Sequence, residues 1–184
     1  MKDANGSEKV SRRGFLTGSA VAIVTVAVSG ATILIDPGGA SGSSRAVVLH
    51  NLTPAQAQVL LQFVRDLFPH AQIAETHYAQ AIEPLNEEAG RDLPTKQLLA
   101  EGIEQLNRLA KAGSGKTYAD VKDERARVEA IKRIEHGPFF AKVYGTTVVS
   151  LYNQPTLWPI FGYQGPSSAK GGYLHRGFND LDWL

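Results

Sequence analysis

The amino-acid sequence predicts an all-α protein: one small domain of about five helices, followed by a long irregular C-terminal segment. Apolar residues recur three and four positions apart through much of residues 53–151, which is the spacing of one helix face. Glycine, proline and aromatic residues dominate after Tyr152, and they exclude a long helix there. Residues 1–35 contain an apolar run and form a separate N-terminal segment. Residues 36–45 are rich in glycine and serine and are expected to be a linker. The domain is therefore expected over residues 46–184, which is enough chain to bury a core.

The N-terminus has the pattern of a twin-arginine export signal. Arg12 and Arg13 are followed, after one glycine, by Phe15 and Leu16, and an uncharged apolar run continues to Ile35. In such a signal the basic residues stay at the inner face of the membrane while the apolar run inserts into the membrane. The alternative is an ordinary secretory signal or an N-terminal anchor that happens to carry two arginines. The run is long enough to span a bilayer, and the sequence leaves open whether it is removed or retained.

The first helix is expected over residues 53–68. Thr53 has a side chain typical of an N-cap, Pro54 suits the first helical position, and Gln56 completes a capping box with Thr53. Apolar residues then recur on one face, and Pro69 ends the helix.

Two further helices are predicted in the middle of the chain. The second covers residues 73–81 or continues past Pro84, and a kink or an early end is expected at this proline. Residues 86–94 are polar and predict a connection. The third helix covers residues 95–112, and the glycine directly after it is a natural end. Gly102 lies on its apolar stripe and permits a close helix crossing, although glycine weakens a helix by about 1 kcal/mol relative to alanine.

A fourth helix is predicted within residues 118–135. Asp123 with Arg127, and Glu129 with Arg133, are spaced as ion pairs one turn apart, which indicates a solvated helix face.

The fifth helix begins near Pro138 and continues to about Tyr152. It is the most apolar helix after the N-terminal run, so we expect it to be the central one. Its β-branched stretch at residues 146–149 is less typical of a helix.

Residues 152–184 hold seven of the fifteen aromatic residues of the chain. So many aromatic residues exclude a freely solvated tail. We expect the segment to wrap the helices of its own chain and also to contact a partner. Tryptophan and tyrosine tend to dominate the binding energy of interfaces. The expected anchors are therefore Trp158, Phe161, Tyr163 and Tyr173.

The tail also carries a resemblance. The run Trp158–Ser167, followed by Gly171–Tyr173, resembles the C-terminal signature of the gluconate 2-dehydrogenase subunit 3 family. The preceding helix with its two adjacent phenylalanines, the Tyr-Asn-Gln-Pro turn and the twin-arginine signal look like the same family. The resemblance is specific over residues 118–184 and in the signal. Over residues 46–112 it consists only of the helical pattern.

This resemblance implies an accessory role. Members of that family are small subunits of membrane-associated sugar, sugar-acid and polyol dehydrogenases. Their large subunit is a flavoprotein of the glucose-methanol-choline type that carries FAD, and a cytochrome c subunit with haem c usually accepts the electrons. The small subunit supplies the export signal for the large one and is needed for its maturation. The implied location is the periplasm, reached through the Tat translocase, at the cytoplasmic membrane.

The residues themselves indicate no reaction centre. The chain has no cysteine, which excludes disulfides, an iron–sulfur cluster of its own and a covalent haem site. Its histidines show no metal-binding spacing, and His70 and His77 are expected to be polar surface residues. No catalytic, cofactor or metal residue is assigned, and the net charge of +1 gives no case for nucleic acid. An independent exported binding or scaffold domain, or an enzyme in its own right, are the alternatives.

Overall fold

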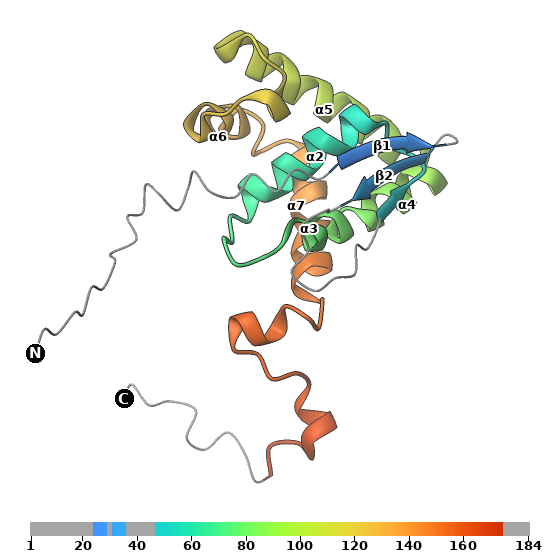
Figure 1. The fold of residues 1–184 in the computed structure, drawn as a ribbon, viewed down its shortest axis with the longest axis vertical. Coiled ribbons are helices and arrows are strands. Elements are labelled where there is room, and N and C mark those ends of the chain that lie inside the picture. The colour runs from blue at the N-terminus through green and yellow to red at the C-terminus, as the bar shows by residue number, and fades with distance from the viewer. Residues whose placement is uncertain (1–23, 29–30, 36–46, 175–184) are drawn as a thin grey trace, which may run out of the picture.

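A computed structural model of the chain describes the backbone of residues 24–28 and 31–35 and the whole of residues 47–174 (Figure 1). The predicted all-α domain is confirmed, with six α-helices in its body where about five were expected. The helices are α2 (Pro54–Leu67), α3 (Glu75–Ala81), α4 (Glu83–Arg91), α5 (Leu93–Ser114), α6 (Glu124–Lys132) and α7 (Pro138–Tyr152). Three 3-10 turns complete the list: η1 (Tyr118–Asp120), η2 (Trp158–Phe161) and η3 (Ser167–Lys170).

A small antiparallel sheet lies beside the helices, and the sequence analysis does not predict it. Its strands β1 (Val24–Val28), β2 (Ala31–Ile35) and β3 (Val47–Leu49) pair in chain order. Figure 1 shows β1 and β2 next to α2. Part of the predicted apolar run is therefore strand in this structure, and the predicted linker, residues 36–45, lies outside the described residues. Within the described ranges no helix is long and apolar enough to cross a membrane.

The first predicted helix is confirmed together with its cap. The Gln56 backbone N–H donates to Thr53 Oγ1 (3.3 Å), and the Thr53 N–H donates to Gln56 Oε1 (3.0 Å). This helix, α2, is the central one: it packs against α3, α5, α6, α7 and the sheet. The expectation that the helix starting at Pro138 is central is wrong, because α7 buries one face, including Phe139 and Val143, and leaves another exposed.

Most of the polar stretch predicted as a connection, residues 86–91, is helical and belongs to α4, and residues 92–94 are the N-cap and first residues of α5. Its polarity misled the prediction because Asn86 is buried as a hydrogen-bonding partner and is not solvated. Asn86 Oδ1 accepts from the Asn51 N–H (2.8 Å), and Asn51 Nδ2 donates to the Asn86 carbonyl (3.0 Å). A buried amide with satisfied hydrogen bonds is compatible with a core position.

The close crossing expected at Gly102 is confirmed, since the ring of Phe139 on α7 occupies the space beside it. The predicted end of this helix is two residues early. Gly113 is still helical, and the chain leaves α5 at Gly115, whose φ of 71° suits glycine.

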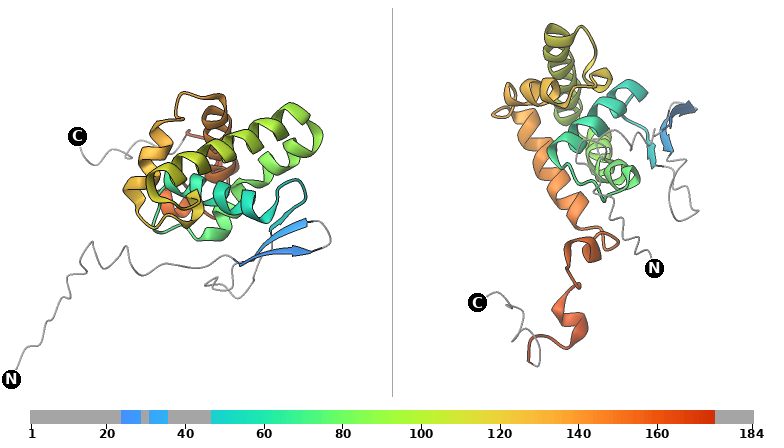
Figure 2. Two further views of the ribbon diagram at one scale, coloured as in Figure 1. Left: turned by 90° about the horizontal axis from the view of Figure 1, so that it is seen from above. Right: turned by 60° about the vertical axis from the view of Figure 1, so that its left-hand side comes forward.

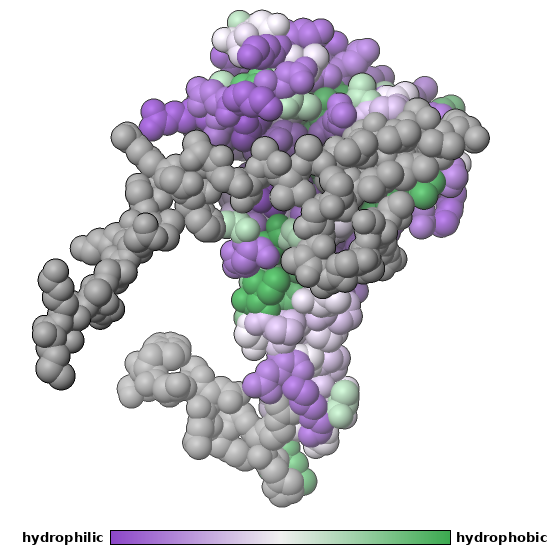
Figure 3. Space-filling view, in the orientation of Figure 1, coloured by the Kyte–Doolittle hydropathy of each residue, from purple (hydrophilic) through white to green (hydrophobic). Residues whose placement is uncertain are grey.

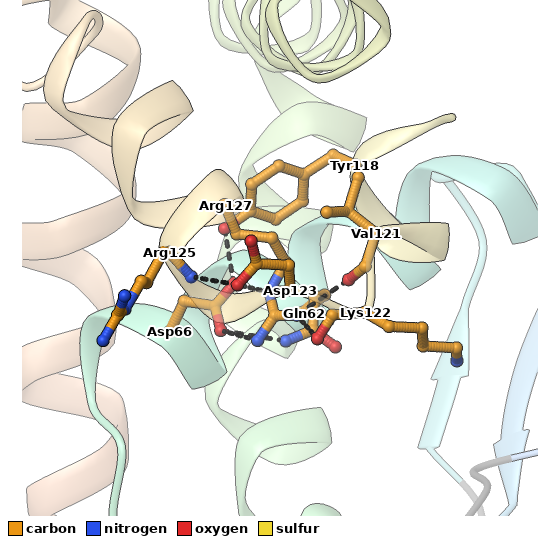
Figure 4. A network of polar contacts seen from close by, with 8 residues as sticks. All are labelled: Gln62, Asp66, Tyr118, Val121, Lys122, Asp123, Arg125 and Arg127. Carbon is orange, nitrogen blue, oxygen red and sulfur yellow. Dashed lines mark hydrogen bonds and ion pairs between the residues drawn. The ribbon is translucent and has the colours of Figure 1, made fainter. Parts of the chain in front are cut away.

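A buried ion pair replaces the predicted pairs along the fourth helix. Arg127 does not pair with Asp123, which instead caps α6 by accepting the N–H of Arg125 (3.1 Å). Arg127 Nε lies 2.8 Å from Asp66 Oδ2 and Nη2 lies 3.0 Å from Oδ1 (Figure 4). The Tyr118 hydroxyl also donates to Asp66 Oδ2 (2.5 Å). The network joins α2 to η1 and α6, which lie more than fifty residues further along the sequence.

The other predicted pair on this helix is also wrong. Glu129 pairs with Lys132 (2.8 Å) on the exposed side of α6, and not with Arg133.

Candidate partner-binding surface

The residues singled out by the sequence analysis fall in two regions. Arg12, Arg13, Phe15 and Leu16 lie outside the described residues. The four aromatic residues predicted as anchors all lie in the described part of the tail, after α7. They are Trp158, Phe161, Tyr163 and Tyr173.

The tail does not wrap the helical body over its described length, which corrects that expectation. Figures 1 and 2 show the chain continuing beyond the end of α7, with η3 away from the body. The preceding turn η2 still touches the loop after α2 through Phe161. Gly162 has a φ of 72° and Gly165 a φ of 90°, so the chain turns sharply at both places. These turns carry residues 162–174 away from α2 and α3. Tyr163 is 50% exposed and Tyr173 is 70% exposed.

Hydrogen bonds fix the direction in which the tail leaves the body. Gln154, just after α7, donates through Nε2 to the His77 carbonyl (2.9 Å), and its Oε1 lies 2.6 Å from His77 Nδ1. Ser150 Oγ donates to the Ala81 carbonyl (2.7 Å). These bonds tie the end of α7 to α3. His77 therefore has a structural role, because it binds Gln154 at the start of the tail. These bonds within the chain hold the start of the tail in place without a partner.

A cluster of three rings joins the tail to the loop after α2. His70 Nε2 lies 2.6 Å from the Tyr152 hydroxyl, and the centroid of the Phe161 ring lies 5.2 Å from that of His70 and 5.3 Å from that of Tyr152. Burial lowers the pKa of His70, and the positive charge of Arg65 lowers this pKa further. His70 is therefore disposed to be neutral and to pack against aromatic rings.

Trp158 organises the tail itself. Its Nε1 donates to the Tyr152 carbonyl (3.1 Å), and its ring meets the Tyr163 ring edge to face at 5.1 Å between centroids. The Tyr163 N–H donates to the Trp158 carbonyl (2.9 Å). Leu157 is fully buried beside this turn. Of the predicted anchors, Tyr163 and Tyr173 are open, Phe161 is half covered, and Trp158 is mainly internal to the tail.

The sequence analysis missed an exposed apolar face of α7. Tyr144 is 45% exposed and Val149 is 65% exposed, and Tyr152 continues this face into the tail. Figure 3 shows hydrophilic residues crowding the upper body and a green and pale area around the lower half of α7. The missed signal was that no charged residue follows Lys142 on this helix. A helix on the outside of a protein normally presents charged side chains on its solvated face.

A cleft on the helical body has few groups that could react with or bind a ligand. It measures about 230 Å³ and lies between α5 and the start of α7. Its charged or titratable lining groups are Glu101, Arg133 and His136, and no hydrogen bond joins any two of them. Among the described residues, no group of three or more histidine, aspartate or glutamate side chains could hold a metal. We take the exposed apolar side chains on α7 and the tail as the candidate binding surface.

Comparison of the chain with family models, curated proteins and solved structures finds no match.

Proposed function

We propose that this protein is the non-catalytic small subunit of a periplasmic, FAD-dependent dehydrogenase complex that oxidises the CH–OH groups of sugars, sugar acids or polyols. Its task is to bind the large flavoprotein subunit of the glucose-methanol-choline type, stabilise it and bring it to the Tat translocase. Arg12 and Arg13 are the export determinants in this proposal. FAD belongs to the large subunit, and haem c belongs to a cytochrome subunit of the same complex.

The observation that carries the proposal is a tail that presents aromatic side chains to solvent although its base is rigidly fixed. Tyr163, Tyr173 and half of Phe161 are exposed, on a segment held by the Gln154–His77 and Trp158–Tyr152 hydrogen bonds. Exposed aromatic residues on a preorganised segment are typical of binding sites, because little conformational freedom is lost on association.

The identity of the partner follows from resemblance. The run Trp158–Ser167 and the residues Gly171–Tyr173 resemble the subunit 3 family, and the twin-arginine pattern fits a chain that exports a folded partner. Because the comparisons with known proteins find no match, the support comes from these sequence features alone. The competing proposal is an independent exported scaffold domain. In that case the tail would act without binding a flavoprotein.

Affinity purification tests the proposal. The full chain with a C-terminal tag is purified from the periplasmic and membrane fractions, and bound proteins are identified by mass spectrometry and by the flavin spectrum. We expect a near-stoichiometric FAD protein that disappears from this compartment when Arg12 and Arg13 are both changed to lysine. A colourless chain recovered alone would contradict the proposal and favour the scaffold function.

A second measurement tests the anchors. The Trp158→Ala, Tyr163→Ala double variant should bind the flavoprotein more weakly by about 2 kcal/mol or more. Unchanged co-purification would remove the tail from the interface.

A further inference from the structure

One continuous part of the chain is exposed and yet carries no charge. From Val143 to Ala169 there is no aspartate, glutamate, lysine, arginine or histidine, although charged residues make up 20% of the chain. The run covers most of α7, the turn η2 and the first part of the tail. Lys142 and Lys170 mark its two ends, and Lys142 is bonded to Glu88. We call the exposed side chains of residues 143–169 the charge-free surface.

Burial does not explain the missing charges. Val149 is among the most exposed apolar residues of the described structure, and Tyr144, Ile160 and Tyr163 are each at least 41% exposed. The long helix α5 shows the ordinary situation, because Glu104, Arg108 and Lys111 are all on its exposed side. A surface that is exposed, rich in aromatic residues and depleted of charge has the composition found at the core of protein interfaces.

The absence of charge also restricts the kind of partner. A charged side chain pressed against this surface would lose its water and find no opposite charge, which is costly. The surface offers only neutral groups for hydrogen bonding, such as the tyrosine hydroxyls and the serine and threonine hydroxyls of residues 143–169. A lipid bilayer fits less well, because segments that lie on membranes usually carry several lysine or arginine residues along a polar face, whereas this run is flanked in the sequence by Lys142, which is bonded to Glu88, and by Lys170.

We propose that the charge-free surface of α7 and the tail is one continuous interface, and that it docks on an uncharged, apolar surface of the large flavoprotein subunit. This inference rests on the proposed function. It adds the α7 face to the aromatic tail and states the chemistry of the partner surface. Contacts between neutral surfaces are not screened by salt, so the complex should withstand high ionic strength.

Charge insertion at Val149 tests the inference. Val149→Lys and Val149→Glu place either sign on the exposed face, where neither disturbs the core. Leu93→Glu is the matched control, because Leu93 is 64% exposed, close to the 65% of Val149, and glutamate suits its position at the start of α5. Each full-length chain is purified with its C-terminal tag, and the FAD bound per chain is measured at about 50 mM and 500 mM NaCl.

We expect the FAD bound per chain to fall by about tenfold or more in both Val149 variants. Leu93→Glu should bind as much FAD protein as the wild type. The wild-type ratio should be equal at both salt concentrations. Retention by both Val149 variants would overturn the inference and leave the proposed function intact. If only one of the two Val149 variants binds the FAD protein more strongly than the wild type, the partner surface is charged, and this result would also overturn the inference. A wild-type chain that recovers no FAD protein, or that sediments with phosphatidylcholine vesicles in its place, would overturn both proposals.

Discussion

The ring of Phe139 lies where a side chain on Gly102 would stand. A Cβ built on Gly102 would be 2.1 Å from Phe139 Cγ, well inside van der Waals contact. The same ring stacks on Phe63 of the central helix, with 5.4 Å between centroids and 18° between planes. The contact thus joins α5, α7 and α2 at one point, and it is possible only because residue 102 has no side chain.

Gly102→Ala should therefore destabilise the protein, by about 1–3 kcal/mol, even though alanine favours a helix by about 1 kcal/mol. Urea unfolding followed by circular dichroism measures the change. Gly113→Ala is the control in the same helix, because nothing lies within 4 Å of its Cβ, and it should stabilise the protein by up to about 1 kcal/mol. Equal effects of the two substitutions would show that α7 does not approach α5 this closely.

Removal of Arg127 should be among the most damaging changes on α6. Arg127→Ala leaves the carboxylate of Asp66, whose side chain is only 5% exposed, without its counter-charge. A broken buried pair of this kind costs about 3–5 kcal/mol. Arg108→Ala is the comparison, because its partner Glu104 is exposed and the pair should contribute less than about 0.5 kcal/mol. Chemical denaturation of both variants gives the two values, and a small loss for Arg127→Ala would mean that water reaches Asp66.

These two sites show why some features were predictable and others were not. Gly102 was found because its position on an apolar stripe is a local pattern. Asp66 and Arg127 are 61 residues apart in the sequence, so no local pattern connects them. Asp123 lies four residues before Arg127, which is the ordinary spacing of an ion pair on a helix, and the sequence therefore favoured it as the partner. Only the tertiary packing of α6 on α2 decides between them. Composition identified the aromatic tail but not its direction, which depends on two positive-φ glycines and on the Gln154–His77 contact.

Stability should fall in strong base because of Tyr118. Burial raises the pKa of its hydroxyl, and the charge of Asp66 and its hydrogen bond raise this pKa further. In the unfolded chain tyrosine loses its proton near pH 10, before the folded chain does. The stabilisation is therefore complete below about pH 10 and declines as the pH rises beyond it, by up to roughly 1.4 kcal/mol per pH unit. Urea midpoints between pH 8 and 11 should show a shallower decline in Tyr118→Phe than in the wild type or in the exposed control Tyr163→Phe.

The contact between Phe161 and His70 offers a direct test of where the tail lies. Because the folded-state pKa of His70 is below its ordinary value, the unfolded chain takes up the proton first as the pH falls. His70 therefore supports the fold above about pH 6.5, and this contribution is lost progressively below it.

Two substitutions separate the causes of the His70 shift. Phe161→Ala uncovers the ring and should raise the pKa of His70 by relieving its burial, which is the larger cause. Arg65→Gln should raise it less, by removing the nearby positive charge, and the exposed control Arg91→Gln should leave it unchanged. NMR titration of the His70 ring proton measures all three. If Phe161→Ala leaves the titration of His70 where it is in the wild type, η2 is not packed against the loop after α2 in solution. The aromatic rings of the tail would then reach a partner from a position other than the one fixed by Gln154 and His77.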